Sequence, residues 1–115
     1  GAIVNNASVL GIRPLANTAI YNASKSAIIG LTKSAALEFA AQGVRVNVVC
    51  PAVIETDMTS LIRDNEALNQ HMKALHPVGR FGKASEVAAA VLYLCSEGAE
   101  FSTGVVLTVD GGYAM

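Results

Sequence analysis

The stretch Ala19-Ile-Tyr-Asn-Ala-Ser-Lys25 places a phenol and an ammonium four positions apart, in a segment that reads as the beginning of a helix. Positions i and i+4 of a helix share a face, so Tyr21 and Lys25 are expected to project side by side. A nearby ammonium stabilises a phenolate, which makes Tyr21 a candidate donor and acceptor of a proton. The stretch therefore predicts acid–base chemistry at the start of this helix.

A serine lies upstream of this tyrosine, at the end of an apolar run. Residues 1–7 have the composition of a buried strand, and Ser8 follows them directly. In open α/β sheets ligands bind outside the carboxyl ends of the strands, where the next helix also begins. We therefore expect Ser8, Tyr21 and Lys25 to converge on one site.

The combination of Ser8 with Tyr21-x-x-x-Lys25 resembles the active site of the short-chain dehydrogenase/reductase family. Three further stretches resemble the single-domain branch of that family, in its order and near its spacing. They are Pro51-Ala-Val-Ile-Glu-Thr56, His76-Pro-Val-Gly-Arg-Phe-Gly82 and Val109-Asp-Gly-Gly-Tyr113. The resemblance thus extends over the whole chain.

The resemblance implies an oxidoreductase that interconverts an alcohol and a carbonyl by hydride transfer with NAD or NADP. It implies that Tyr21 passes a proton to or from the substrate oxygen and that Ser8 hydrogen-bonds the same oxygen, so both bind substrate. Lys25 is expected to support the tyrosine and to bind the nicotinamide ribose. A fourth family residue, an asparagine on the preceding helix, is not covered by this sequence.

Further cofactor contacts are implied for the segment after the second predicted strand. The resemblance implies that the Ile54 backbone and the Thr56 hydroxyl contact the amide and phosphate side of the cofactor. The family usually has Pro-Gly where this chain has Pro51-Ala52, a change expected to keep the turn that faces the nicotinamide. The implied cofactor-binding residues are Tyr21, Lys25, Pro51, Ala52, Ile54 and Thr56.

The order of apolar segments predicts one α/β fold. Strands are expected at residues 1–7, 44–50 and 104–109, a long helix at 21–41 and a later helix at 86–95, capped by Ser85. Residues 57–75 are polar and loosely periodic, and they are expected to form a mobile lid of two short helices. The fold class is the C-terminal half of a doubly wound parallel-sheet Rossmann-type domain, with right-handed crossovers.

The composition points to the interior of a larger domain. Hydrophobic residues make up 52% of the chain and charged residues only 15%, against a typical share of about 25%. Residues 1–115 are therefore expected to be one incomplete domain whose N-terminal cofactor-binding half is absent. Alone, they are expected to bind neither dinucleotide and to aggregate through the unpaired edge of the first strand.

Charge and cysteine content exclude several classes of partner. A net charge of −1 and a pI near 6.1 give no electrostatic reason to bind nucleic acid or a membrane, and no leader or spanning segment is visible. Cys50 and Cys95 lack metal-ligand or disulfide spacing, so no metal site is expected and both are interpreted as core thiols. A reducing cytoplasm fits this composition.

The expected partners are a small alcohol or carbonyl substrate and a second copy of the chain. The resemblance implies a dimer or tetramer that uses the helix at 21–41, with residues 111–115 at a subunit interface. A different hypothesis is a non-catalytic fragment that acts only through association of its apolar helices. Enoyl reduction and sugar epimerisation, which other family members perform, are less favoured because their usual spacing or length differs.

Overall fold

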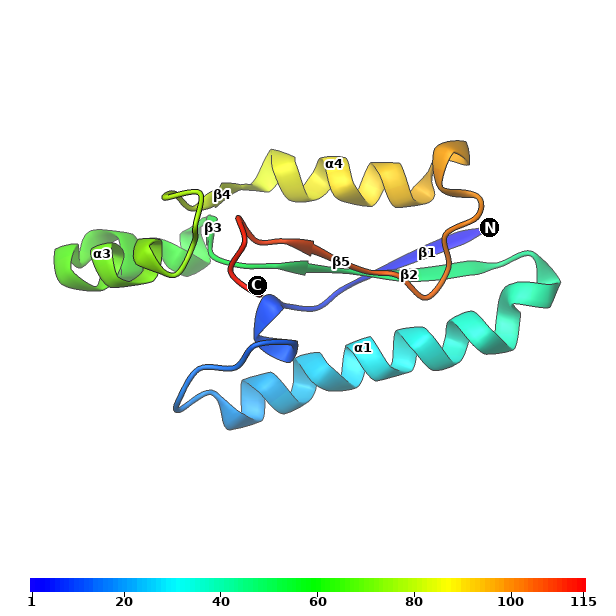
Figure 1. Ribbon diagram of the computed structural model, residues 1–115, viewed down its shortest axis with the longest axis horizontal. Helices are drawn as coiled ribbons and strands as arrows, with labels where there is room; N and C mark the ends of the chain where they lie inside the picture. Colours follow the sequence, from blue (N-terminus) through cyan, green and yellow to red (C-terminus); the bar gives the residue numbers. More distant parts are fainter.

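The computed structural model describes residues 1–115 as a parallel sheet between two layers of helix (Figure 1). The three main strands are β1 (Ala2–Asn6), β2 (Arg45–Pro51) and β5 (Val106–Val109), in the order β1-β2-β5. Val4 pairs with Asn47, and Val49 pairs with Leu107. This arrangement has the predicted α/β class, and its three strands lie close to the predicted ranges.

The central strand β2 forms the core. Its five inner residues are all buried, which explains why residues 46–50 show no alternation of polar and apolar side chains. Buried Asn47 interrupts this apolar run, and both ends of its amide are satisfied. Its Nδ2 donates to the carbonyl of Ser102 at 2.9 Å, and its Oδ1 accepts from the N–H of Val105 at 2.9 Å. The amide therefore fixes the loop that leads into β5.

The two long helices cover opposite faces of the sheet (Figure 1). Helix α1 (Ala19–Phe39) connects β1 to β2, and α4 (Ala84–Cys95) precedes β5. The connections β1–α1–β2 and β2–α4–β5 both lead to the next strand in the same direction across the sheet. Because α1 and α4 lie on opposite faces of the sheet, these two crossovers have opposite handedness. The expectation of right-handed crossovers throughout was therefore wrong. That preference arises when a twisted strand leads directly into the helix, whereas a long segment separates β2 from α4.

This intervening segment contains the predicted lid. It comprises β3 (Ile54–Glu55), the 3-10 turn η3 (Asp57–Thr59), α2 (Ser60–Asp64), α3 (Glu66–Ala74) and β4 (Gly82–Lys83). The two short helices are confirmed, while the pairing of β3 with β4 was not expected. A Cβ atom at Gly82 would lie 2.6 Å from Cδ1 of Ile54, so a larger residue at this position would require the Ile54 side chain to shift.

The start of α4 differs from the prediction. Ser85 does not cap the helix, which begins at Ala84, because the Glu86 carboxylate accepts from the Lys83 N–H at 2.8 Å. Glu86 also forms a salt bridge with Arg80 at 2.7 Å. The hydrogen bond from Arg80, followed by that from Lys83, lowers the pKa of Glu86 from 4.5 to about 2. A carboxylate at N3 thus replaces the capping side chain.

Replacing Glu86 by glutamine is expected to remove a stabilising contribution that depends on pH. Because the folded state lowers this pKa, the contribution is present above pH 4.5 and is lost as the pH falls toward about 2. The difference in melting temperature between native and Glu86→Gln proteins should therefore shrink over that range, and it should stay small because the pair is exposed. Glu100→Gln, at an exposed carboxylate with no hydrogen bond, is the control. A constant difference down to pH 2 would contradict the assignment.

The expectation that both cysteines are core thiols was only partly right. Cys50 is buried, and burial raises the pKa of its thiol, whereas Cys95 is exposed at the last turn of α4. Helix α1 covers the sheet on one side, but its outward side leaves Ile20, Leu31 and Leu37 exposed at 89%, 64% and 85%. None of the helices is both long and apolar enough to span a membrane.

Candidate active site

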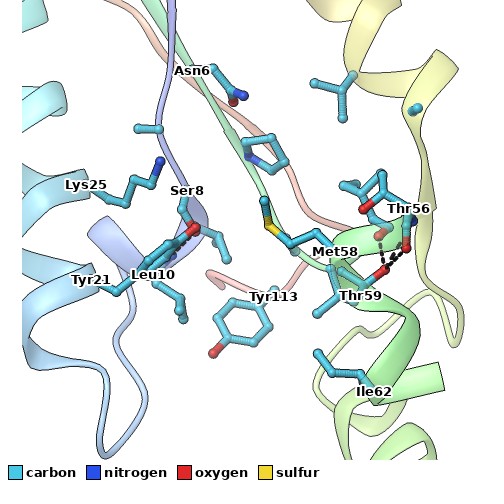
Figure 2. A pocket seen from close by; sticks show the side chains of 18 of the residues that line it. Asn6, Ser8, Leu10, Tyr21, Lys25, Thr56, Met58, Thr59, Ile62 and Tyr113 are labelled. Atoms are coloured by element: carbon cyan, nitrogen blue, oxygen red, sulfur yellow. Dashed lines mark hydrogen bonds between the residues drawn. The ribbon is translucent and has the colours of Figure 1, made fainter. Parts of the chain in front are cut away.

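A cavity of about 650 Å³ lies at the carboxyl ends of β1 and β2, between α1 and the lid (Figure 2). Its wall is mostly apolar, and its volume is within the range of about 300–1,000 Å³ that is usual for small-molecule sites. The structure brings every sequence-predicted site residue to this cavity. They are Ser8, Tyr21, Lys25, Pro51, Ala52, Ile54 and Thr56.

Ser8 is held by the turn that follows β1. Its backbone is extended (φ −162°, ψ 151°), and its hydroxyl oxygen accepts from the N–H of Leu10 at 3.1 Å. The side chain is thereby directed at the cavity wall with the residue only 8% exposed. Since the oxygen accepts in this bond, the O–H proton remains free to be donated to a ligand.

Helix α1 fixes the position of this turn through two side chains. Asn22 donates to the carbonyl of Leu10, and the Ser26 hydroxyl donates to the carbonyl of Gly11 at 3.1 Å. A Cβ atom at Gly11 would lie 3.1 Å from the backbone carbonyl carbon of Lys25 and 3.2 Å from the backbone nitrogen of Ser26, so glycine favours this close approach of the turn to the helix. Ser8 is therefore held in a defined position relative to the helix that carries Tyr21.

Tyr21 and Lys25 lie on one face of α1, as their spacing predicts. The Lys25 ammonium nitrogen is 5.3 Å from the centroid of the Tyr21 ring. Tyr21 is 46% exposed, and neither side chain forms a hydrogen bond or salt bridge within the chain. The donors of both side chains are therefore available to a ligand in the cavity (Figure 2).

The opposite wall consists of the end of β2 and the lid. Strand β2 does not stop before Pro51, which pairs with Val109 as its last residue. The hydroxyl of Thr59 donates to the carbonyl of Ile54 at 2.6 Å and accepts from the N–H of Thr56 at 3.1 Å. These bonds hold the backbone of the lid entrance, whereas the Thr56 hydroxyl, at the N-cap of η3, donates no hydrogen bond within the chain and lines the cavity.

His76 is a buried histidine for which the sequence predicts no role. It is 3% exposed, and its Nδ1 lies 2.8 Å from the carbonyl of Met72. Its Nε2 accepts from the N–H of Val53 at 3.3 Å, so Nδ1 carries the proton in this neutral tautomer. Met72 and Val53 both line the cavity, and the imidazole therefore joins the lid to the segment after β2.

Replacing His76 by phenylalanine is expected to destabilise the full-length protein by about 2 kcal/mol, because the Val53 N–H and the Met72 carbonyl would lose their partner. The ring contacts with Phe81 and Tyr113 can persist. The KM for the cofactor should rise as well, since the segment after β2 loses its anchor. Denaturant unfolding and steady-state kinetics measure both effects. His76→Gln can still donate and accept hydrogen bonds, so it should recover part of the stability and part of the KM. Equal losses in His76→Phe and His76→Gln would contradict a role of His76 as a hydrogen-bonding link.

Tyr113 is a second residue that the sequence did not assign to the cavity. Tyr113 lines the cavity and is only 2% exposed. Arg13, in the loop after Ser8, contacts it. The Arg13 guanidinium donates to the Tyr113 carbonyl at 2.6 Å, and its central carbon is 5.3 Å from the ring centroid. Within residues 111–115, which are expected at a subunit interface, Tyr113 packs inside its own chain and leaves its neighbours for such a contact. Met115 remains exposed at 90%.

No group of three or more histidine, cysteine, aspartate or glutamate side chains in the structure is placed to hold a metal ion. The candidate site therefore consists of hydroxyl groups, one ammonium and an apolar wall.

The sequence matches one family model over residues 1–114, described as "Enoyl-(Acyl carrier protein) reductase". The 3-oxoacyl-(acyl-carrier-protein) reductase FabG of Chlamydia trachomatis serovar D is 42% identical over 114 residues, which are 99% of this chain and 45% of that protein. The chain thus spans about half the length of the curated relatives that it matches.

Solved structures with the same fold include a short-chain type dehydrogenase/reductase from Mycobacterium ulcerans, with a TM-score of 0.96 and 33% identity over 99% of this chain and 42% of that one. The 3-ketoacyl-(acyl-carrier-protein) reductase of Brucella melitensis was solved with NADH (TM-score 0.87, 35% identity, 99% and 44% covered). ElxO was solved with NADP (TM-score 0.90, 38% identity, 98% and 46% covered). These likenesses confirm the predicted fold class.

Proposed function

Because the chain belongs to the short-chain dehydrogenase/reductase family, we propose that the full-length protein is an NAD(P)-dependent oxidoreductase that interconverts an alcohol and a carbonyl by hydride transfer. One observation carries the proposal: Ser8, Tyr21 and Lys25 line a single cavity, with their polar hydrogens available to a ligand. Arrangements of this kind suit a reaction in which negative charge develops on a substrate oxygen.

In the reductive direction Ser8 and Tyr21 donate hydrogen bonds to the carbonyl oxygen of the substrate. Both bonds strengthen as that oxygen becomes an alkoxide, so they lower the barrier rather than only binding the substrate. Tyr21 then transfers its proton to the oxygen. The ammonium of Lys25, 5.3 Å from the ring centroid, stabilises the phenolate that remains. Oxidation of the alcohol follows the same steps in reverse.

The donors in the cavity fit a nicotinamide dinucleotide. The Lys25 ammonium and the Thr56 hydroxyl donate no hydrogen bond within the chain, and both suit the hydroxyl and phosphate oxygens of such a cofactor. Pro51, Ala52 and Ile54 form an adjoining apolar wall for a flat ring. When bound, the cofactor supplies or accepts the hydride. The relatives solved with NADH and NADP support this assignment without deciding between the two.

The lid contributes by excluding water. Met58, Ile62 and Met72 present apolar side chains to the cavity from the segment that connects β2 to α4. A closed, dry site strengthens the hydrogen bonds from Ser8 and Tyr21 and protects the transferred hydride. The predicted mobility of this segment is part of the proposal.

The proposal extends to the assembly of the protein and to its location in the cell. The exposed apolar side chains on α1, among them Leu31 and Leu37, favour association with a second copy of the protein. Both cysteines are free thiols, which suits a reducing cytoplasm.

A screen of the full-length protein tests this function. NADH and NADPH oxidation would be followed with a panel of ketones, a 3-oxoacyl thioester and an enoyl thioester, and reduction of a ketone or 3-oxoacyl compound is expected. The enoyl arm tests a second candidate, reduction of a carbon–carbon double bond, which the description of the matching family model names. Binding of a dinucleotide without turnover of any compound would favour the non-catalytic hypothesis.

A further inference from the structure

The Tyr113 hydroxyl is the only buried side-chain polar atom in the structure that lacks a hydrogen-bond partner. Leaving such a group unpaired costs about 1–3 kcal/mol, so folded proteins rarely do so without a reason. The residue is only 2% exposed, so its hydroxyl is shielded from solvent in this structure. A group that binds beside it in the cavity would supply the missing partner.

The backbone around Tyr113 is held firmly. The Asp110 carboxylate accepts from the N–H groups of Gly112 at 3.1 Å and Ala114 at 2.9 Å. Arg13 binds the Tyr113 carbonyl from the loop that follows Ser8. The backbone that carries the ring is therefore fixed beside the cavity, which lowers the entropic cost when a ligand binds.

The place of the ring in the cavity suits contact with a substrate. Figure 2 shows Tyr113 extending from the C-terminal loop between Leu10 and Tyr21 on one side and Ile62 of the lid on the other. Burial raises the pKa of the phenol, which consequently remains a donor at neutral pH. A ligand group that meets it must be a hydrogen-bond acceptor.

We propose that the Tyr113 hydroxyl donates a hydrogen bond to a second oxygen of the substrate, distinct from the oxygen that Ser8 and Tyr21 bind. Tyr113 would then select carbonyl substrates that carry such an oxygen over hydrocarbon analogues of the same length. An analogue without the oxygen leaves the buried hydroxyl unpaired, which makes discrimination of this kind strong. The inference rests on the proposed function, because it assumes that the cavity binds a carbonyl substrate.

Two ketones of equal chain length can test whether Tyr113 binds a second substrate oxygen. Ethyl 3-oxobutanoate and 2-heptanone are both methyl ketones, and only the first has ester oxygens. Their affinities would be measured by calorimetry for the full-length protein saturated with oxidised cofactor, a complex that cannot turn over. Tyr113→Phe is expected to weaken binding of the ester about tenfold and to change binding of 2-heptanone less than about twofold. Tyr93→Phe, on the exposed side of α4, should change neither.

Thermal stability supplies the second readout. Since phenylalanine keeps the ring and removes an unpaired hydroxyl, Tyr113→Phe should melt at or above the native temperature. A lower melting temperature would show that another part of the full-length protein satisfies the hydroxyl, and this would overturn the proposal. Equal changes for both probes, no change for either, or no preference of the native protein for the ester would also overturn it. Because binding is measured without turnover, an inactive protein that still shows the tenfold difference would refute only the proposed reaction.

Discussion

Replacing Tyr21 by phenylalanine in the full-length protein is expected to lower kcat by about 100- to 10,000-fold, the usual contribution of a positioned acid–base group. Only the phenolic oxygen is removed, and that oxygen makes no hydrogen bond within the chain, so folding should be unaffected. Lys25 and the segment after β2 remain in place, and the dissociation constant of the cofactor should change less than about threefold. Turnover and cofactor titration measure the two effects separately.

Tyr93→Phe is the matched control for this substitution. Tyr93 is 50% exposed on α4 and does not line the cavity, so removal of its hydroxyl should leave kcat and cofactor affinity unchanged. If Tyr21→Phe retained a kcat close to that of this control, the proton-transfer role would be refuted. A parallel loss of melting temperature would instead indicate a structural role.

Replacing Lys25 by alanine is expected to weaken both turnover and cofactor binding. The ammonium beside the Tyr21 ring would no longer stabilise the phenolate, and the proposed contact with the nicotinamide ribose would be lost. A decrease in kcat of about 100-fold or more and a rise in the cofactor dissociation constant of about tenfold are expected.

Lys33→Ala provides the control on the same helix, because Lys33 is exposed and lies outside the cavity. It should leave both constants unchanged. A Lys25→Ala protein with normal cofactor affinity would exclude the ribose contact, and one with normal kcat would exclude support of the phenolate.

Local patterns predicted most of the fold. The uninterrupted apolar run in β2 reflects burial on both faces, and the small, apolar residues of α1 reflect its packing on the sheet. The handedness of the crossover from β2 through the lid and α4 to β5 could not be predicted from local patterns. It depends on where this long connection leaves the sheet. The β3–β4 pairing was missed for a related reason, since two-residue strands carry no periodicity.

The difference between local contacts and contacts between distant segments also explains which residues of the site could be predicted. Tyr21 and Lys25 are neighbours on one helix, and Ser8 ends a strand, so their proximity follows from local geometry and the rule for strand ends. Tyr113 and Arg13 meet across almost the whole chain, and the partners of His76 are backbone groups, which have no sequence signature. Composition alone likewise predicted burial of Cys95, although its position on α4 turns it outward.

The most direct test of the central claim, that Tyr21 supplies the proton to the substrate oxygen, is a single-turnover measurement on the full-length protein. Enzyme saturated with reduced cofactor would be mixed with a ketone from the screen, and the loss of reduced-cofactor absorbance would report the chemical step without product release. Tyr21→Phe is expected to slow this step by about 100-fold or more, whereas Tyr93→Phe should proceed at the native rate. A Tyr21→Phe rate within about threefold of the native one would contradict the central claim.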